Sequence, residues 1–468
     1  MRRKQTFQLH PPALETSEEE WFRLSILDMV VPPNYNTYAI IFKQNSSSEE
    51  AIIETFKRGL EATLQQCRHL VGKIQKNKHG DYSVVRSADS TVEFVVQWLN
   101  TPSDDYPSYD DLERSDFTLA SLRDHTILGV EGIPDSCHPD DSPIVVGFQL
   151  NLIRNGFIFT AHIHHFALDM TGTTSLIHQI AENCSSVVNL TPKPRWDESF
   201  MDRSRFIAPD IAVEDQIDPP PRPERHPDWL SCSWLLFHLP PGKSKDLKQL
   251  ATPLDGTWIS TYDAVIALLW RVIMRTRAKV YKPDILSPAI FGEPINMRNR
   301  CTPKVSARYQ GNVLAAGLSM HQENPLTLAD VISRASLSQI AVFVRAITHS
   351  VGQHTLDETM GKVAPIRDKS NLDMPLDSLP PMSFTTTDWR NSKLCDNDFG
   401  IGQPVAYRCL YNTVVENMII LYPPHKGYNG KSGGIEVMLP IETHAIGMLM
   451  DDPDIKKFFE FRSIEVKG

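Results

Sequence analysis

The chain alternates between two hydrophobic patterns, one typical of strands and one typical of helices. Short β-branched and aromatic runs predict strands at residues 37–43, 82–85, 156–163, 413–422 and 434–439. Apolar positions at helical spacing predict helices at residues 49–67, 173–184 and 260–275, and another within 328–348. We expect the last two strands to be joined by a glycine-rich turn at residues 427–434. Because strands and helices mix in both halves of the chain, the pattern predicts an α/β or α+β architecture.

A proline-rich segment at residues 218–229 divides the chain into two halves of similar size. Its prolines remove backbone donors and hold the chain extended. The length of 468 residues is enough for two or three domains. We therefore expect a first domain at residues 1–215, a crossover linker at 216–232 and a second domain at 233–468. Acidic segments at residues 103–116 and 135–142 are expected to be surface loops.

Composition excludes several classes of function. The net charge is −10, and no Lys/Arg blocks occur, which argues against nucleic acid and anionic membranes as partners. No apolar run approaches the ~18 residues that span a bilayer, and the polar start does not resemble a secretory signal. The seven cysteines are scattered, with no CxxC pair, so we expect reduced thiols and neither disulfides nor a metal site. These features predict a soluble, cytoplasmic protein.

The sharpest local motif is a histidine cluster where a predicted strand ends and a helix begins. His162, His164 and His165 are followed by Asp169. The pKa of histidine lies near neutrality, so such a side chain can take a proton from a hydroxyl and return it. The alternative is structural: Asp169 would cap the helix, and the histidines would be hydrogen-bonded groups at the end of the strand.

Two further segments contain candidate residues. Trp389 precedes a motif with Asp398, Gly400 and Gly402, whose glycines allow a tight turn; by itself this segment is an ordinary turn. In the other segment, Arg298 and Arg300 would face the same side of a strand, from which either can reach a buried carboxylate. The alternative for that segment is a solvated basic loop.

In this order and spacing, the three motifs resemble the BAHD acyl-CoA-dependent acyltransferases, whose marks are HHxxxDG and DFGWG. The similarity extends to an opening signature at residues 24–28, a helix and turn at 60–74, a helix from Ser260 to Arg271, and a closing strand and helix at 434–458. Two departures stand out: Met170 follows the motif Asp, with Gly172 two residues later, and Ile401 replaces the tryptophan of DFGWG. Both departures are more similar to fungal members, so we expect a fungal secondary-metabolite pathway.

The resemblance implies two chloramphenicol-acetyltransferase-like domains with mixed β-sheets and an active-site channel between them. It implies that His165 is the general base, that Asp169 pairs with Arg298, and that Trp389 donates to the oxyanion. It also implies that Ser260 and Thr261 hold CoA phosphate at a helix N-terminus. Asp398, Gly400 and Gly402 would give structural support.

The expected reaction is acyl transfer, with acetyl-CoA as donor, to a hydroxyl or amine of a small-molecule natural product. The expected enzyme is a monomer without a metal. Its CoA would need a local positive patch, for which Arg271, Arg275 or Arg277 are candidates, and acceptor-pocket residues are expected on the loops 28–36 and 312–320. The alternatives are a condensation or cyclisation enzyme of the same fold that does not use acyl-CoA, and a non-catalytic ligand binder. A binder would be expected to have lost His165, which is present.

Overall fold

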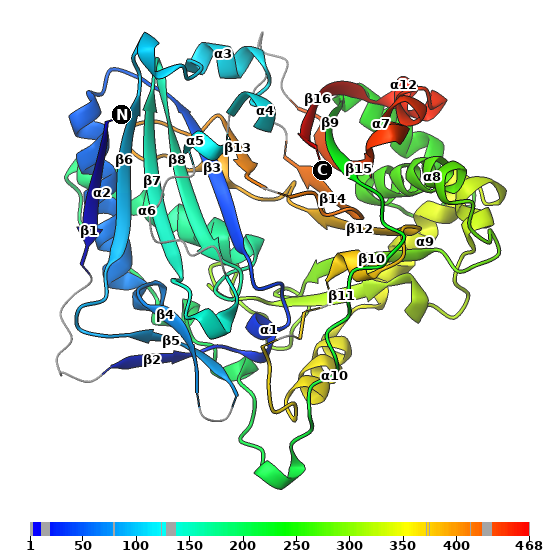
Figure 1. The fold of residues 1–468 in the computed structure, drawn as a ribbon, viewed down its shortest axis with the longest axis horizontal. Helices are drawn as coiled ribbons and strands as arrows, with labels where there is room; N and C mark the ends of the chain where they lie inside the picture. Colours follow the sequence, from blue (N-terminus) through cyan, green and yellow to red (C-terminus); the bar gives the residue numbers. More distant parts are fainter. Residues whose placement is uncertain are drawn as a thin grey trace.

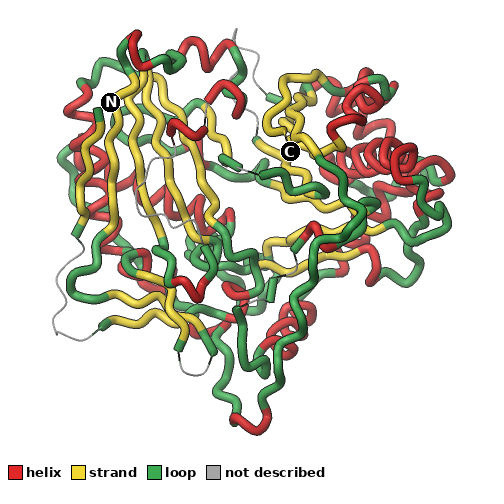
Figure 2. The backbone as a smooth tube through the Cα atoms, in the orientation of Figure 1, coloured by secondary structure: helices red, strands yellow, loops and turns green. Residues whose placement is uncertain are grey.

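The computed structural model describes residues 3–467 except for 11–18, 78–79, 123, 128–136, 371, 374, 412 and 424–432. Two mixed β-sheets lie next to each other, each with helices packed against it (Figure 1). Figure 2 shows that long irregular segments, drawn in green, connect the two halves. The architecture is therefore the predicted mixed α/β arrangement.

The first sheet has six strands in the order β1-β6-β7-β8-β3-β13. Its strands are β1 (Lys4–Leu9), β3 (Tyr35–Lys43), β6 (Val92–Leu99), β7 (Val146–Ile153), β8 (Gly156–His164) and β13 (Ala406–Cys409). Two helices, α2 (Glu49–Gln66) and α6 (Met170–Asn189), pack against each other behind this sheet in Figure 1. Aromatic rings fill the space between sheet and helices; Phe42, for example, stacks on Phe157 with 4.6 Å between ring centroids. Strands β7 and β8 are buried along their whole length, which explains their apolar sequence.

The second sheet has seven strands in the order β11-β10-β12-β14-β15-β9-β16. They are β9 (Cys232–Leu239), β10 (Ile290–Asn296), β11 (Leu314–Leu318), β12 (Ser383–Asp388), β14 (Met418–Tyr422), β15 (Ile435–Glu442) and β16 (Glu460–Lys467). Its helices are α7 (Pro241–Ala251), α8 (Thr261–Tyr281), α9 (Leu337–Ser350), α11 (Ile446–Met450) and α12 (Pro453–Phe458). The buried face of α8 carries Trp270, which lies beside Phe291 and Phe384 of the sheet.

A small sheet and several short helices complete the fold. The small sheet has the order β2-β5-β4, from β2 (Glu20–Arg23), β4 (Lys73–Lys76) and β5 (Tyr82–Arg86). The remaining helices are α1 (Ile26–Met29), α3 (Tyr109–Arg114), α4 (Leu119–Leu122), α5 (Asp124–Ile127) and α10 (Gln353–Val363).

The two halves of the chain are interleaved. Strand β13 comes from the second half of the sequence, yet it pairs with β3 in the first sheet. In addition, the segment between β10 and β11 reaches the start of α6 in the first half, where the Arg298 guanidinium meets Asp169. The second half therefore contributes to both sheets and to the loop that carries the histidine motif.

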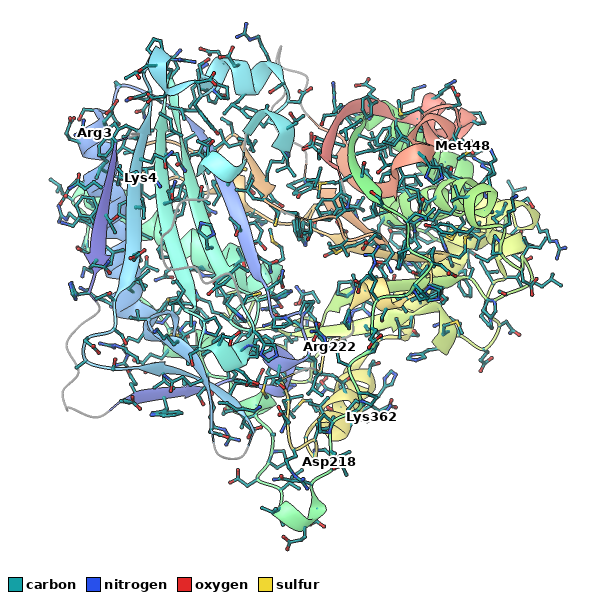
Figure 3. The ribbon with its side chains drawn as sticks, in the orientation of Figure 1. Arg3, Lys4, Asp218, Arg222, Lys362 and Met448 are labelled. Atoms are coloured by element: carbon teal, nitrogen blue, oxygen red, sulfur yellow. The ribbon has the colours of Figure 1, made fainter. Side chains whose placement is uncertain are left out.

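The proline-rich segment runs along the outside of the molecule. Asp218 accepts a hydrogen bond from Arg367, and Arg222 donates to Asp373. Figure 3 labels Asp218 and Arg222 on this segment, in the lower part of the view. Ion pairs to residues 367–377 and to Glu416 therefore hold the extended chain. The domain boundaries at 215 and 233 stay a prediction.

Most predicted elements are present with small shifts at their ends, and two expectations were wrong. The strand expected at 413–422 begins only at Met418 in β14. The acidic segment at 103–116 contains α3, because Ser108 and Asp111 form a capping box and Tyr109 and Leu112 are buried. The expected turn at 427–434 lies mostly outside the described residues, although β14 and β15 do pair antiparallel. The first two residues of the acidic segment at 135–142 also lie outside the described residues.

Candidate active site

The three histidines of the motif have different surroundings. His162 and His164 are buried, whereas His165 is partly exposed. The Nδ1 atom of His162 lies 3.0 Å from the Thr37 hydroxyl. Both ring nitrogens of His164 are engaged, because Nε2 lies 2.8 Å from the Cys137 carbonyl and Nδ1 accepts the Phe166 N–H at 3.2 Å. His164 therefore has no nitrogen left for a substrate.

His165 is the partly exposed histidine of the motif. It follows the last residue of β8, and its Nδ1 atom is buried without a hydrogen-bond partner among the described residues. Its backbone, in contrast, is held on both sides. The N–H donates to the Asn34 carbonyl at 2.8 Å, and the carbonyl accepts from Asn312 Nδ2 at 2.9 Å. A fixed backbone with an unengaged ring suits a group that must meet a substrate.

Burial sets the protonation behaviour of the cluster. Desolvation lowers the pKa of His162 to about 3 and that of His164 to about 4. Burial also lowers the pKa of His165, and the backbone groups of His165 and Leu168 and the carboxylates of Asp169 and Asp28 oppose this shift. His165 is therefore neutral near pH 7, which is the form that accepts a proton.

Asp169 has a structural environment. It is the N-cap of α6, where Oδ1 accepts the Gly172 N–H at 2.7 Å. Arg298 donates two hydrogen bonds to the same carboxylate, from Nη1 to Oδ2 at 2.7 Å and from Nη2 to Oδ1 at 3.0 Å. The Val313 N–H donates to Oδ2 at 3.0 Å, and both ion-pair partners are 2% exposed. The expected contact between Asp169 and Arg298 is therefore present, and it leaves the carboxylate fully occupied by the protein.

A second buried ion pair holds the other end of this loop. Asp28 Oδ2 accepts from Arg203 Nε at 3.0 Å, and Arg203 Nη2 donates to the Ala167 carbonyl at 2.9 Å. Asp28 Oδ1 accepts from both the N–H and Nδ2 of Asn312, each at 2.9 Å. Asp28 and Asn312 are the first residues of the loops 28–36 and 312–320, on which acceptor-pocket residues were expected; both side chains are fully buried and bonded to each other. Residues 314–318 of that second loop are strand β11.

Trp389 lies just after β12 and reaches the site through a tyrosine. Its ring meets Tyr38 of β3 edge-on at 6.1 Å and Tyr422 of β14 at 5.4 Å. Burial raises the pKa of Tyr38; the nearby Asp169 charge adds to this shift, and the neighbouring Thr173 side chain opposes it. The Tyr38 hydroxyl therefore lies near the start of α6. The Trp389 indole N–H makes no hydrogen bond within the described parts of the chain.

Ser260 and Thr261 lie elsewhere, at the N-terminus of α8 in the second half. Ser260 caps this helix: its Oγ accepts the Asp263 N–H at 3.2 Å, and its own N–H donates to the Asp263 carboxylate at 2.6 Å. Arg345 lies 3.5 Å from that carboxylate. The capping box therefore occupies both polar groups of Ser260 and places a negative charge where a phosphate was expected.

The expected basic patch near Ser260 was wrong in its residues. Arg271 donates to the carbonyls of Val331 and Ala335, and Arg275 pairs with Asp452 and Asp454. Arg277 is buried against Glu442 at 3.1 Å. The cations that do lie around the start of α8 share aromatic partners: Arg345 and Lys248 are 4.0 and 5.6 Å from the Trp258 ring, and Arg390 is 5.5 Å from Tyr262.

The glycine motif packs against the far end of α6. Gly400 has φ of +76°, and a Cβ there would lie 2.9 Å from Val188 Cβ. The exposed Asp398 carboxylate accepts the Gly400 N–H at 2.9 Å, and Phe399 packs on Phe42. Since Val188 lies 19 residues after Asp169, the turn is roughly 28 Å along the helix from the histidine loop. The glycine motif therefore packs against the first sheet and α6. It contacts none of the residues of the histidine loop.

The structure thus brings together His165, Asp169 and Arg298, and links Trp389 to them through Tyr38. It leaves Ser260, Thr261 and the glycine motif apart. Sequence reasoning gave no role to Arg203, and it named Asp28 and Asn312 only as the first residues of the expected acceptor-pocket loops. Leu24 to Asp28 had been noted as a signature, but the partners of Asp28 lie 175 and 284 residues away, so only the fold joins them.

Several solved structures share this fold. The crystal structure of F. graminearum TRI101 with ethyl coenzyme A superposes with a TM-score of 0.76 at 21% identity, covering 95% of this chain and all of that one. Vinorine synthase superposes with a TM-score of 0.66 at 18% identity, covering 96% of each chain. The first condensation domain of the calcium-dependent antibiotic synthetase reaches 0.52 at 14% identity, covering 91% of this chain and 90% of that domain. The fold is therefore that of the two-domain CoA-acyltransferases.

Sequence comparison narrows this class to a family. The model described as Transferase family matches residues 7–453. Acetyltransferase FGR3 of Gibberella zeae is 40% identical over 99% of this chain and 95% of its own length. Trichothecene 3-O-acetyltransferase TRI101 of Fusarium sporotrichioides is 23% identical over 80% of this chain and 83% of its own. The chain belongs to the Transferase family and is an acyl-CoA-dependent acyltransferase, as the resemblance to the BAHD enzymes predicted.

Two features are absent from the described residues. No helix in that part of the chain combines the length and apolar character needed to cross a bilayer. The same residues contain no group of three or more His, Cys, Asp or Glu side chains placed to hold a metal ion.

Proposed function

We propose that this acyltransferase moves an acetyl group from acetyl-CoA to a hydroxyl of a small-molecule natural product, with His165 as the general base. The observation that carries the proposal is the contrast within the motif: His165 is partly exposed, its Nδ1 has no partner among the described residues and its backbone is held from both sides, while His162 and His164 are buried. Relatives named as trichothecene and eremophilane O-acetyltransferases support a hydroxyl acceptor and an acetyl donor.

The proposed chemistry is a proton transfer coupled to acyl transfer. The imidazole of His165 takes the hydroxyl proton as the acceptor oxygen attacks the thioester carbonyl carbon. The Trp389 indole N–H donates to the oxyanion of the tetrahedral intermediate, a contribution typically of a few kcal/mol. The carbon–sulfur bond then breaks, and the protonated His165 returns the proton to the CoA thiolate.

The other residues hold this arrangement in place. In this proposal Asp169 and Arg298 fix the loop that presents His165, and the turn of Asp398, Gly400 and Gly402 supports the helix behind it. Ser260 and Thr261 at the start of α8 contribute to CoA binding. Since the Ser260 hydroxyl is the helix cap, the free N–H groups of the first turn and nearby cations provide the attraction for phosphate.

A thiol-release assay with acetyl-CoA and a panel of alcohols and amines tests the function. We expect CoA release that depends on an alcohol and is lost in His165→Ala. Transfer only from an acyl group on a carrier protein would favour the condensation alternative instead. Calorimetry with CoA should show saturable binding that weakens with salt, because the cofactor is a polyanion.

We also propose that the enzyme works as a cytoplasmic monomer in a fungal secondary-metabolite pathway. Its cysteines are free thiols and most are buried, which fits a reducing compartment. Fungal relatives such as the Eremophilane O-acetyltransferase of Penicillium roqueforti support the pathway. Light scattering after size-exclusion chromatography gives the oligomeric state, and cell fractionation gives the location.

A further inference from the structure

Asn312 bridges the backbone of His165 to a buried carboxylate. Its Nδ2 atom donates to the His165 carbonyl and to Asp28 Oδ1, each at 2.9 Å. The Asn312 backbone N–H donates to the same carboxylate oxygen at 2.9 Å. The side chain is fully buried. Both amide protons are therefore used, one on the His165 carbonyl and one on the Asp28 carboxylate.

The Asp28 carboxylate is itself held by several other donors. Asp28 Oδ2 accepts from the N–H and the hydroxyl of Ser25, each at 2.8 Å, and from Arg203. Arg203 also donates to the Ala167 carbonyl at 2.9 Å. The carbonyls of His165 and Ala167 are therefore tied to one carboxylate, the first through Asn312 and the second through Arg203. A fixed peptide plane fixes the direction in which the His165 ring leaves the backbone.

One short segment from the second half of the chain holds both ends of the motif loop. Asn312 holds His165, while its neighbours hold Asp169: the Val313 N–H donates to the Asp169 carboxylate, and the Gly311 carbonyl accepts from Arg298 at 2.8 Å. The close approach extends to the helix, because a Cβ on Gly172 would lie 3.2 Å from the Gly311 oxygen. The position of the loop therefore depends on the position of residues 311–313, which belong to the second half of the chain.

We propose that Asn312 is a positioning residue for the base, acting through the His165 carbonyl. The inference rests on the proposed role of His165 and goes beyond it, because it makes the aim of the imidazole depend on a side chain from the other half of the chain. Misplacement of a reacting group by about 1 Å lowers rates by about 100-fold. Loss of the bridge should therefore reduce turnover and leave binding of the two substrates largely unchanged.

Asn183 offers a matched control. It is also a fully buried asparagine, its Nδ2 donates to Thr63 and Gln66, and its Oδ1 has no partner, as is also true of Asn312. It lies on α6, 14 residues after Asp169, and touches no residue of the loop. Asn183→Ala should lower the melting temperature about as much as Asn312→Ala. We expect kcat to fall about 10- to 100-fold in Asn312→Ala, with KM for acetyl-CoA within about twofold, and to stay unchanged in Asn183→Ala.

A second variant tests the inference if Asn312→Ala does not fold. Asn312→Ser keeps one donor, which can satisfy Asp28 but cannot also reach the carbonyl, so it should show the same loss of kcat in a more stable protein. If the folded serine variant, or Asn312→Ala itself, turns over as fast as Asn183→Ala, the inference is overturned.

A double mutant separates this inference from the proposed function. In the His165→Ala background, Asn312→Ala should cause no further loss, because residues that act as a unit are not additive. An equal fold-loss in both backgrounds would show that Asn312 acts elsewhere and would overturn the inference. Wild-type activity in His165→Ala alone would instead refute the base assignment, and the inference would fall with it.

Discussion

At the scale of single residues, the histidines of the motif make different predictions. His165→Ala should lower kcat by at least ~100-fold, the usual range for a positioned general base, with the fold intact. His164→Ala should cost less than about tenfold in kcat but should lower the melting temperature, since both its ring nitrogens make hydrogen bonds inside the protein. Steady-state kinetics and thermal melts of both variants check this. Equal loss of turnover in two folded proteins would contradict the roles given to them.

The protonation of His165 predicts the pH dependence of the enzyme. A base must be neutral, so activity falls as the pH drops through its pKa. Because burial lowers the pKa of His165, the acid limb of kcat/KM should lie below the ordinary histidine value of about 6.5. A pH–rate profile from about pH 4.5 to 8 measures it. An acid limb above pH 7 would mean that His165 is not desolvated, or that another group titrates.

At the scale of elements, the contact between the start of α6 and the β10–β11 segment predicts energetic coupling. Asp169→Asn and Arg298→Gln each leave a buried charge without its partner, which typically costs about 3 to 5 kcal/mol. The double variant should be less destabilised than the sum, with a coupling on the order of 0.5 to 3 kcal/mol. Denaturant unfolding of the four proteins gives the cycle. Additive effects would show that the ion pair does not form in solution, and a loss of rate with unchanged stability would favour a catalytic Asp169.

The glycine motif allows a second test at this scale. Gly400→Ala should destabilise by about 1 to 3 kcal/mol, because the residue has positive φ and its new Cβ would collide with α6. Gly402 also has positive φ, but its nearest neighbour would be 4.0 Å away, so Gly402→Ala should cost less. Gly361 lies in α10 with open space around it, and alanine there should be neutral or stabilising. The melting temperature should be highest for Gly361→Ala, lower for Gly402→Ala and lowest for Gly400→Ala. Any other order would contradict the packing argument.

These elements also show how far local sequence carries a prediction. Strand β8 and helix α6 were predictable, because a continuous apolar run and a helical spacing each fit one structure. Helix α3 had a readable capping box, Ser108 with Asp111, but its acidic composition favoured a loop. Hydrogen bonds from Asn312 to Asp28 and His165 span 284 and 147 residues, and no local pattern encodes them. The histidine loop was visible in the sequence, whereas the groups that hold it were not.

At the scale of the whole molecule, a buried ionic cluster joins the two sheets. Arg408 of β13 pairs with Glu436 of β15 at 2.8 Å, and Glu465 of β16 accepts the Leu119 N–H of α4. Burial raises the pKa of Glu465 from 4.5 to about 7, an effect that Arg408 opposes and Glu436 increases. The folded state therefore holds a proton that the unfolded chain releases near pH 4.5. The stability from this proton is complete below that pH and is lost as the pH rises through about 7.

The resulting prediction concerns stability against pH. Raising the pH from 5 to 8 should lower the free energy of unfolding by up to about 3 kcal/mol through this group. Glu465→Gln cannot ionise and should flatten that part of the curve, while Glu460→Gln on the same strand, largely exposed, should not. Urea unfolding at several pH values measures both. A wild-type stability that rises steadily over this range, with no change in Glu465→Gln, would show that the carboxyl is ionised in the folded protein.

The pairing of β13 with β3 has a consequence for how the protein is made. Strand β3 leaves the ribosome early, and its edge partner is translated about 360 residues later. At about 5 to 20 residues per second, an apolar strand with unpaired amide groups waits roughly 20 to 70 s for its neighbour. An open edge of this kind readily pairs with other chains. The open edge of β3 therefore exposes the nascent first half to aggregation until translation is almost complete, and slow synthesis lengthens this period.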